Sequence, residues 1–502
     1  MSQETMPNWL DKRAKLTPNR VAIYFEKESI TFEQLRQQSL QLAKKLTTIG
    51  VRKGTHLAVY GHNSVDFVRC VHAISYIGAV GVFLNTKLTA KEIVYQIEDA
   101  QCNYVIYDDA LIEQMECVRD QTEVTACSFS ALQRITITPF ERKEEVDLAD
   151  LHTILYTSGT TGYPKGVMLS YGNHWWSAVS SALNLGISDK DEWLVAMPLF
   201  HVGGLSTLFK SVIYGMPVHL YASFDVEAVH EAIMHQGVSH VSVVSLMANR
   251  LLKRLGEGQY PSCFRCMLLG GGPAAKPLLE RAAMKQIPII QTYGMTETSS
   301  QIVTLSAEDA LKKIGSAGKA LFSAECKIMI DYQEARPNEV GEIVVKGPMV
   351  TKGYYNRPDV NAQTIIDGWL YTGDAGYLDE DGYLYVVDRR KDLIISGGEN
   401  IYPAEIESVL IGMEAINEVG VIGQEDCKWG QVPVAFIVVN KSYEVTFDEV
   451  MEYTQPKLAK YKLPKRIYVV SSLPRNASNK LMRRQLAEWL ERGDVRIEHA
   501  LD

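Results

Sequence analysis

The residues best suited to chemistry form one short stretch rich in glycine and hydroxyl groups, Tyr156-Thr-Ser-Gly-Thr-Thr-Gly-Tyr-Pro-Lys-Gly166. Its glycines let the backbone approach a bulky anion closely. Backbone amides, hydroxyl groups and an ammonium together suit a polyphosphate. The stretch is not a Walker loop, because its lysine is followed by glycine rather than by Ser or Thr. A plain surface loop would explain the glycines alone. The whole string predicts a phosphate-binding loop made of Thr157, Ser158, Gly159, Thr160, Thr161, Gly162 and Lys165.

A second candidate group, Tyr293-Gly-Met-Thr-Glu297-Thr, directly follows a predicted strand at 288–291. Magnesium prefers a few carboxylates together with phosphate oxygens, so Glu297 is a candidate metal ligand. The ring of Tyr293 could stack on a purine. A simple turn between a strand and a helix is the alternative explanation for Gly-Met-Thr-Glu taken alone.

Three further residues have chemistry that depends on their surroundings. Asp374, in Tyr371-Thr-Gly-Asp374, is expected in a tight turn where its carboxylate can accept both ribose hydroxyls. Ordinary turn chemistry is the alternative. His201 follows a predicted strand in the loop 198–204, and acid–base work by this residue would require a suitable geometry. Lys480, in Pro474-Arg-Asn-Ala-Ser-Asn-Lys480, would by itself be read as a surface lysine.

The elements that position these residues alternate between helix and strand patterns. Thr31 has the sequence of a helix cap, and strands at 57–60 and 81–84 flank a helix at 64–77. This rhythm predicts a layered α/β domain with a largely parallel sheet. The apolar runs 154–156 and 167–169 are predicted strands, which makes the phosphate-binding stretch a hairpin loop.

The character of the chain changes twice towards its C-terminus. After about residue 320, short strands separated by Gly, Asn and Asp turns indicate a small barrel-like part or sheet. Beyond the charged run 388–392 lies a compact α+β stretch of ordinary domain size. The fold class is therefore α/β and α+β, with a large N-terminal domain at 1–389 and a small C-terminal domain at 390–502.

Length and composition agree with this organisation. A chain of 502 residues is too long for one hydrophobic core. Apolar residues make up 46% and charged residues 22%, as in ordinary globular proteins. The net charge of −9 argues against non-specific binding to nucleic acid or anionic membranes. The most apolar stretch, 67–84, contains Arg69, His72 and two glycines, so it is predicted to be a buried helix and strand rather than a membrane span.

The cysteines and the N-terminus indicate a cytoplasmic protein. The first residues lack a basic region followed by an apolar core, so no signal peptide is expected. The eight cysteines are scattered, and Cys263 and Cys266 form the only close pair, without the second pair or histidines of a zinc site. They are expected to be reduced, mostly structural thiols.

Taken together, these motifs resemble those of the adenylate-forming enzymes, which include acyl-CoA synthetases, firefly luciferase and the adenylation domains of peptide synthetases. The resemblance runs in family order from about residue 15 to about residue 490. It implies an enzyme that uses ATP, Mg²⁺ and, as co-substrate, CoA. Asn479 stands where the family usually has Gly, but Asn also tolerates a left-handed turn.

The resemblance also implies a role for each site residue. Thr296 would contact the AMP phosphate, Glu297 would bind the metal, and Lys480 would neutralise the reacting oxygens. His201 would gate the acyl pocket and Lys391 would be the hinge. The remaining assignments are a nucleotide groove at Gly270, Gly271, Gly272, Tyr293, Gly294 and Met295, ribose contacts from Asp374 and Arg389, and room for pantetheine at Gly397 and Gly398.

Four stretches, 172–186, 198–216, 397–403 and 474–480, further resemble the 2-succinylbenzoate–CoA ligases of bacterial menaquinone synthesis. Such a substrate has an aromatic ring and two carboxylates, and its distal benzoate needs a cation or several hydrogen-bond donors. The candidate donors are Ser206, Lys210, Ser299, Ser300 and Gln301.

Three alternatives stay open at this point. The chain could be another aryl- or fatty-acyl-CoA ligase, a stand-alone aminoacyl-adenylating domain, or a non-catalytic nucleotide-binding interaction protein. The expected partners are small-molecule substrates, with no nucleic acid and no membrane span. The sequence leaves homo-oligomerisation open.

Overall fold

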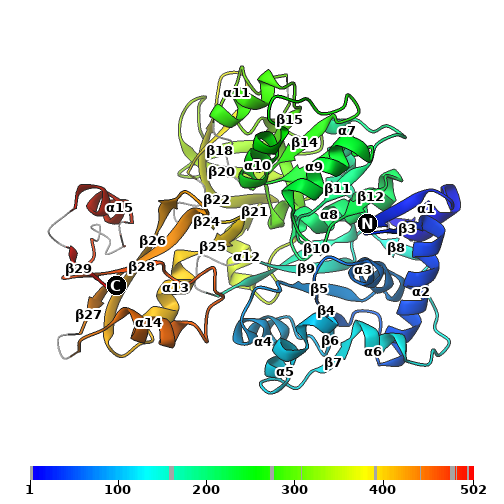
Figure 1. Ribbon diagram of the computed structural model, residues 1–502, viewed down its shortest axis with the longest axis horizontal. Helices are drawn as coiled ribbons and strands as arrows, with labels where there is room; N and C mark the ends of the chain where they lie inside the picture. The colour runs from blue at the N-terminus through cyan, green and yellow to red at the C-terminus, as the bar shows by residue number, and fades with distance from the viewer. Residues whose placement is uncertain are drawn as a thin grey trace. The chain divides into compact units, whose positions relative to one another are not determined.

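The computed structural model describes residues 4–157, 163–271, 276–306, 308–388, 393–440, 443–474, 481, 483–493 and 497–501 (Figure 1). The chain divides into two compact units. The first consists of Met1–Thr86, Ile97–Tyr156 and Gly166–Asp388, and the second of Lys87–Gln96, Thr157–Lys165 and Arg389–Asp502.

A six-stranded sheet carries the two strands that flank the predicted phosphate-binding loop. Its order is β10-β9-β5-β4-β6-β7, and the pairs from β9 to β7 are parallel. Because β9 and β10 are consecutive and adjacent, the predicted strand–loop–strand arrangement is confirmed at this position. The strands are β4 (His56–Tyr60), β5 (Val80–Leu84), β6 (Tyr104–Tyr107), β7 (Thr125–Ser128), β9 (Leu151–Thr157) and β10 (Lys165–Ser170).

A nine-stranded sheet forms the centre of the first unit, in the order β17-β16-β15-β14-β13-β11-β12-β2-β3. Its strands from β15 to β2 are parallel, and antiparallel strands extend both edges. The strands are β2 (Val21–Phe25), β3 (Glu28–Thr31), β11 (Trp193–Val195), β12 (Val218–Leu220), β13 (His240–Val243), β14 (Cys266–Leu269), β15 (Ile289–Met295), β16 (Ser300–Leu305) and β17 (Lys319–Ala320).

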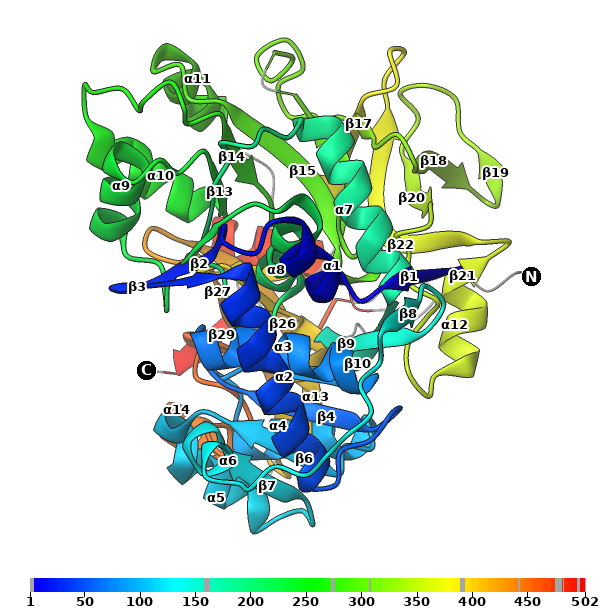
Figure 2. The same cartoon turned by 90° about the vertical axis from the view of Figure 1, so that its right-hand side faces the viewer.

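Helices cover both faces of this sheet. Thr31 and Gln34 form a reciprocal capping box that starts α2, as the sequence predicts. Side chains of α2, α3 and α8 share one apolar core with strands of both large sheets. Helices α9, α10 and α11 enclose a second core on the other face (Figure 2). The helices of the first unit are α1 (Trp9–Leu16), α2 (Phe32–Thr48), α3 (Val65–Ile77), α5 (Ile112–Arg119), α6 (Phe129–Gln133), α7 (Tyr171–Leu185), α8 (Val202–Tyr214), α9 (Val226–His235), α10 (Ser245–Leu255), α11 (Lys276–Met284) and α12 (Pro358–Thr364), with short 3₁₀ turns η1 (Asp109–Leu111) and η2 (Thr296–Thr298).

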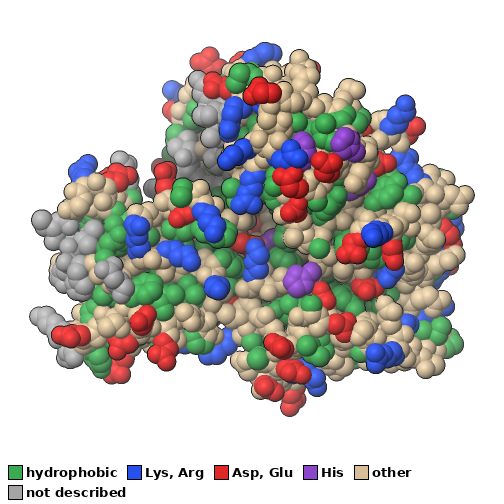
Figure 3. Space-filling model, in the orientation of Figure 1, with side chains coloured by type: hydrophobic (Ala, Val, Ile, Leu, Met, Phe, Trp, Pro, Cys, Tyr) green, Lys and Arg blue, Asp and Glu red, His purple; other side chains and the backbone are tan. Residues whose placement is uncertain are grey.

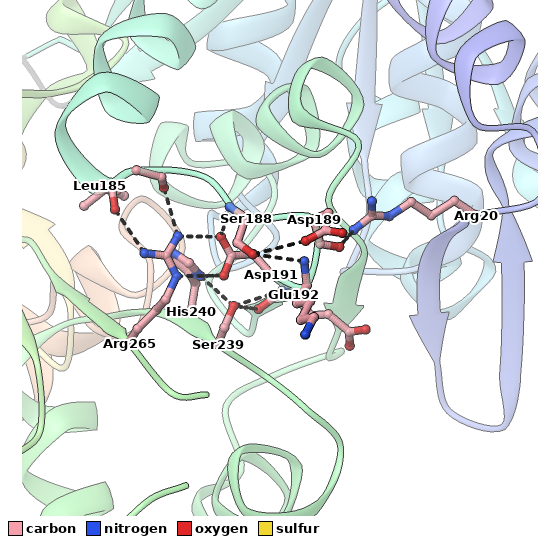
Figure 4. A network of polar contacts seen from close by, with 11 residues as sticks. Arg20, Leu185, Ser188, Asp189, Asp191, Glu192, Ser239, His240 and Arg265 are labelled. Atoms are coloured by element: carbon pink, nitrogen blue, oxygen red, sulfur yellow. Dashed lines mark hydrogen bonds and ion pairs between the residues drawn. The ribbon is translucent and has the colours of Figure 1, made fainter. Parts of the chain in front are cut away.

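An ion-pair network ties together the N-terminal ends of the central strands (Figure 4). Arg265, just before β14, donates to both carboxylate oxygens of Asp191, at 2.7 and 2.5 Å. Burial opposes ionisation of Asp191, but the hydrogen bonds from Arg265 and the Ser188 amide hold its pKa below the usual value. The same guanidinium donates to the Gly186 carbonyl, so one side chain joins the end of α7 to the strands.

A third sheet, of six strands, follows in the chain. Its order is β19-β18-β20-β22-β21, and β23 pairs with β22. The predicted small β part is thus a sheet, and its core includes Tyr293 from β15. These strands are β18 (Glu325–Ile330), β19 (Gln333–Glu334), β20 (Gly341–Lys346), β21 (Ile365–Ile366), β22 (Trp369–Leu378) and β23 (Leu384–Asp388), and a separate two-stranded ribbon joins β1 (Thr5–Pro7) to β8 (Glu145–Asp147).

The second unit is an α+β body with its own apolar core. Its sheet has the order β25-β24-β27-β28-β29, with β26 also paired to β27. The elements are β24 (Ile394–Ser396), β25 (Glu399–Ile401), α13 (Pro403–Leu410), β26 (Ile416–Asp426), β27 (Gly430–Val439), α14 (Phe447–Thr454), β28 (Arg466–Val470), α15 (Arg483–Arg492) and β29 (Ile497–Leu501), and α4 (Ala90–Asp99) contributes its first residues.

The predicted α/β and α+β classes and the largely parallel sheets are confirmed. The stretch 67–84 is indeed the buried helix α3 followed by β5, and no described helix is long and apolar enough to cross a membrane. The face drawn in Figure 3 carries both basic and acidic side chains.

Two local predictions were wrong. β15 continues to Met295, so Tyr293 lies inside a strand rather than after one. Asp374 lies in a bulge of β22 rather than in a turn between strands: the register with β20 shifts between Glu342 and Val344, and Gly373 takes a φ of 74° there.

Candidate active site

Glu297 lies where ligands commonly bind α/β proteins, just beyond the carboxyl end of a parallel strand. It belongs to η2, the single turn that follows β15, and only 2% of the residue is exposed. Its Oε1 accepts a hydrogen bond of 2.9 Å from the hydroxyl of Tyr354. Its backbone carbonyl accepts one of 2.7 Å from the amide of Thr351. The carboxylate is therefore buried and oriented by a neutral donor.

Asp374 is a second buried carboxylate with a tyrosine partner. It is 2% exposed, and its Oδ2 accepts a hydrogen bond of 2.8 Å from the hydroxyl of Tyr293. Burial first, and then the charge of Asp374, raise the pKa of Tyr293 well above its ordinary value, so this hydroxyl keeps its proton. The contact joins the two predicted nucleotide groups, and no sequence pattern predicts it.

Glycines next to these carboxylates permit close backbone approaches. A Cβ on Gly294 would lie 1.9 Å from the Ser300 carbonyl oxygen, so the close pairing of β15 with β16 requires glycine here. Gly270 follows β14, and its amide donates to the Val243 carbonyl. Gly271 has a φ of 82°, which an L side chain rarely adopts. Gly272, also predicted in this groove, lies outside the described residues.

His201 is the N-cap residue of α8, at the carboxyl side of β11. The loop before it is held by Asn63, a buried residue that sequence reasoning missed. The Asn63 amide donates to the carbonyls of Met197 and Tyr221, and its oxygen accepts from the Leu199 amide at 2.8 Å. One side chain from the β4–α3 loop thus fixes the approach to His201. An isolated Asn with no adjoining motif offers no signal of this role.

Lys210 lies nine residues further along α8 and is 2% exposed. Its ammonium lies 5.3 Å from the centre of the Trp193 ring. Among the described residues, no carboxylate lies within ion-pair distance of it, and burial lowers its pKa to about 8. A buried cation without a counter-charge is costly, which makes this position a candidate for binding an anion.

The other predicted acid-pocket residues lie on α8, on β16 and, for Ser299, directly before β16, and α8 packs against β16. Ser206 is buried on α8. Gln301 is buried on β16, and neither its amide nitrogen nor its oxygen has a partner among the described residues. Ser299 donates to the Met349 carbonyl, and Ser300 is half-buried with a φ of 109°. Gln301 and Lys210 therefore both have unused polar groups, whereas Ser299 is already satisfied.

Several predicted residues belong to the second unit or are not described. Thr157 ends β9 and Lys165 begins β10, and both are half-buried. Gly397 and Gly398 form the left-handed turn between β24 and β25. A Cβ on Gly397 would lie 2.8 Å from the Trp429 ring. Outside the described residues lie Ser158, Gly159, Thr160, Thr161, Gly162, Arg389, Lys391 and Lys480.

The structure thus brings Tyr293 and Asp374 into contact, and Thr296 and Glu297 follow Tyr293 closely in the chain. Sequence reasoning missed Tyr354 as well as Asn63. In the segment Gly353-Tyr-Tyr355, nothing in the sequence distinguishes a buried hydroxyl aimed at Glu297 from an ordinary aromatic core residue. The eight cysteines are all free, as predicted, and no group of three metal-ligating side chains occurs in the part of the chain that the structure describes.

Comparisons with known proteins agree with this geometry. Residues 10–355 match the AMP-binding enzyme family, and residues 405–480 match the AMP-binding enzyme C-terminal domain. A 2-succinylbenzoate–CoA ligase from Oceanobacillus iheyensis is 53% identical over 97% of this chain and 100% of its own length.

Solved structures of o-succinylbenzoate CoA synthetase from Bacillus subtilis are also similar. A double mutant of that enzyme bound to its product analogue is 48% identical, covers 97% of this chain and 99% of its own, and superposes with a TM-score of 0.93. The same enzyme in complex with ATP and magnesium ion is 48% identical over 96% of this chain and 100% of its own, with a TM-score of 0.76. With matches of this extent, the chain belongs to the AMP-binding enzyme family, the adenylate-forming enzymes.

Proposed function

We propose that this protein is an AMP-forming acid–CoA ligase that converts 2-succinylbenzoate, ATP and CoA to 2-succinylbenzoyl-CoA, AMP and diphosphate, in menaquinone biosynthesis. The observation that carries the proposal is the identity above 50% with 2-succinylbenzoate–CoA ligases over nearly the whole chain. The buried carboxylates Glu297 and Asp374, each oriented by a tyrosine, support the nucleotide half of the reaction.

The physical problem is that a carboxylate is a poor acyl donor, because its leaving group would be oxide. Joining it to AMP, with release of diphosphate, supplies a good leaving group for the later attack by a thiol. Charge neutralisation and positioning should dominate such a step. In this proposal the 157–165 loop binds the β- and γ-phosphates, Asp374 and Arg389 bind the ribose, and Lys480 neutralises the reacting oxygens.

A single buried carboxylate at Glu297 fits a magnesium ion that is held mainly by phosphate oxygens and water. When bound, the metal would neutralise charge on the phosphates. Thr296, the residue before Glu297, would contact the AMP phosphate, and the groove residues Gly270, Gly271, Gly272, Tyr293, Gly294 and Met295 would surround the nucleotide.

In this proposal the acid lies near α8, with the reacting carboxylate close to His201, the N-cap residue of the helix. The buried ammonium of Lys210 attracts the benzoate carboxylate. Ser206 and Gln301 would supply further hydrogen bonds, because the Gln301 amide has no partner among the described residues. Ser299 and Ser300 adjoin Gln301 and remain weaker candidates.

The second half-reaction needs Lys480 to leave and a thiol to enter. We propose that the C-terminal domain, 390–502, rotates about Lys391 relative to the N-terminal domain, 1–389, and that Gly397 and Gly398 then leave room for the pantetheine arm. A biosynthetic enzyme of this kind would work in the cytoplasm, as a monomer or a homo-oligomer.

The test is an assay for AMP and CoA-thioester formation with four acids: 2-succinylbenzoate, benzoate, coumarate and a medium-chain fatty acid. We expect thioester formation only with 2-succinylbenzoate at low substrate concentration. A preference for one of the other acids would replace the substrate but keep the reaction class. Adenylate formation without transfer to CoA would favour an aminoacyl-adenylating domain, and binding of ATP without any turnover would favour a nucleotide-binding interaction protein.

A further inference from the structure

Tyr354 is the partner of the Glu297 carboxylate, and it reaches that carboxylate from an element distant in sequence. It lies between β20 and α12, and it is buried. Its hydroxyl lies 2.9 Å from Glu297 Oε1. A buried tyrosine hydroxyl usually finds a hydrogen-bond partner. The partner here is the carboxylate proposed to bind the metal.

The backbone of Tyr354 is fixed on both sides by Asn361. The Tyr354 amide donates to Asn361 Oδ1 at 2.7 Å, and Asn361 Nδ2 donates back to the Tyr354 carbonyl at 2.9 Å. A side chain whose backbone is held twice by one neighbour presents its hydroxyl in a defined direction. Asn361 comes from α12, so this helix supports the position of Tyr354.

The same segment also pairs with β10, the strand that follows the phosphate-binding loop. Tyr354 forms an antiparallel bridge with Val167. On either side of the bridge, the Tyr355 amide donates to the Gly166 carbonyl at 2.8 Å, and the Met168 amide donates to the Gly353 carbonyl at 3.0 Å. The segment 353–355 therefore acts as a short extra strand beside β10.

Thr351 makes the second connection between these parts. Its amide donates to the Glu297 carbonyl at 2.7 Å, and its hydroxyl donates to the Met168 carbonyl at 2.5 Å. Glu297 is thus held at its main chain by Thr351 and at its side chain by Tyr354. Thr351 donates to β10 directly, and Tyr354 is tied to β10 through the backbone bonds of its neighbours Gly353 and Tyr355. A shift of β10 would move the carboxylate with it.

We propose that Tyr354 is a positioning residue that orients the Glu297 carboxylate for magnesium and holds it at a fixed position relative to β10. The inference rests on the proposed function and adds a residue to it. A neutral hydroxyl fixes one carboxylate oxygen and adds no charge of its own. Hydrogen bonds from outer residues to a ligating carboxylate commonly change metal affinity 10- to 100-fold.

The variant that tests this is Tyr354→Phe, which removes one oxygen atom and keeps the ring in the core. The matched control is Tyr355→Phe. Its hydroxyl donates instead to Gln101 Oε1 at 2.8 Å, away from Glu297. Binding of Mn²⁺ is measured by electron paramagnetic resonance in the presence of a non-hydrolysable ATP analogue, and the Mg²⁺ dependence of adenylate formation is measured in parallel.

We expect Tyr354→Phe to weaken Mn²⁺ binding at least tenfold and to raise the Mg²⁺ concentration for half-maximal adenylate formation by a similar factor. At saturating Mg²⁺, adenylate formation should recover most of its rate, and Tyr355→Phe should match the wild type. Combining Tyr354→Phe with Glu297→Gln should add little to Glu297→Gln alone, because both changes act on one interaction.

Unchanged Mn²⁺ affinity in a folded Tyr354→Phe protein, or additive effects in the double variant, would overturn the proposal. If Tyr354→Phe fails to fold, Asn361→Ala releases the backbone of Tyr354 instead and should weaken Mn²⁺ binding in the same direction by a smaller factor, and no weakening there would also overturn it. Failure of the proposed function looks different, since the wild-type protein itself would then form no adenylate with any acid.

Discussion

The two units each bury a lysine, and the two lysines differ in their surroundings. Lys462, in the second unit, lies 2.6 Å from Glu92 Oε1 and 2.7 Å from Glu405 Oε1. Burial acts to lower its pKa, but Glu405, followed by Tyr461 and Glu92, outweighs burial and raises it above the ordinary value. Lys210, in the first unit, lies over Trp193 with no carboxylate nearby among the described residues, and burial lowers its pKa to about 8.

Lys462 is a structural cation, because two carboxylates neutralise it inside the fold. We propose that Lys210, by contrast, binds a ligand. An ammonium between two carboxylates is compensated inside the fold, and it holds α13 and the first turn of α4 in the second unit together. An ammonium buried without a counter-charge destabilises the unliganded protein. We propose that an anion that binds next to Lys210 compensates this cost. The proposed substrate brings such an anion, the benzoate carboxylate.

Removing Lys462 should have the largest effect on stability. Lys462→Ala leaves Glu92 and Glu405 buried without their cation, and breaking a buried pair in this way costs about 3–5 kcal/mol. We expect a clear fall in Tm, measured by differential scanning calorimetry. The control is Lys460→Ala, which removes an exposed lysine two residues away. A Tm for Lys462→Ala equal to that of the control would mean that the ion pairs of Lys462 contribute nothing to stability.

Removing Lys210 should have the opposite effect on stability. The difference between the ordinary lysine pKa of 10.5 and the value of about 8 corresponds to roughly 3 kcal/mol. Because the charged form is the disfavoured one, Lys210→Met should stabilise the unliganded protein by up to about that amount near pH 7. The same variant should bind 2-succinylbenzoate at least tenfold more weakly, by loss of a charged hydrogen bond.

Chemical denaturation and the KM for 2-succinylbenzoate measure these two effects separately. The exposed Lys190, replaced by Met, serves as the control for both. A Lys210→Met protein that is less stable than wild type would place Lys210 in the same structural class as Lys462, and the comparison between them would fail.

Buried histidines of the first unit, like Lys210, are bases whose charged form is disfavoured by burial. Burial lowers the pKa of His174 to about 3 and that of His72 to about 4. In the unfolded chain these imidazoles titrate near pH 6.5. The free energy of unfolding is therefore highest above pH 6.5 and falls as the pH drops towards the pKa values of the folded protein. Each buried histidine should make the free energy of unfolding at pH 5 about 2 kcal/mol lower than at pH 7.

Urea denaturation at pH 7 and pH 5 tests this. His174→Gln should reduce the loss of stability between the two pH values by about 2 kcal/mol. His235→Gln, at an exposed position, should leave it unchanged. An equal pH dependence in wild type and His174→Gln would show that His174 is not buried in its neutral form.

Patterns local in sequence predicted the fold well, whereas contacts between distant residues could not be predicted. The capping box at Thr31 and the strand–loop–strand around residue 160 depend on neighbouring residues, and they are present as expected. Glu297 and Asp374 were predicted from their motifs together with the family resemblance, and the structure buries both carboxylates. The role of Tyr354 and the contact of Tyr293 with Asp374 were not predicted. Each joins residues 57 or 81 positions apart, and such a contact leaves no periodic pattern in the sequence.

The bulge that carries Asp374 was missed for a related reason. Thr-Gly-Asp is typical of turns, and only the pairing of β22 with β20 converts that local bend into a strand irregularity. The burial of Lys210 was also not predictable from neighbouring residues. A lysine on an amphipathic helix is ordinarily exposed, and its burial depends on the packing of α8 against β11 and β16.

The smallest predicted effect is a change in substrate affinity with pH. Because Lys210 must be charged to attract a carboxylate and its pKa is about 8, the KM for 2-succinylbenzoate should be flat below pH 8 and rise about tenfold per pH unit above it. The KM for ATP, which does not contact Lys210 in this proposal, should not show this rise in the same protein. In Lys210→Met the rise should disappear, since no titrating group remains at that position. A rise that persists in Lys210→Met would assign the titration to another residue and separate the low pKa of Lys210 from acid recognition.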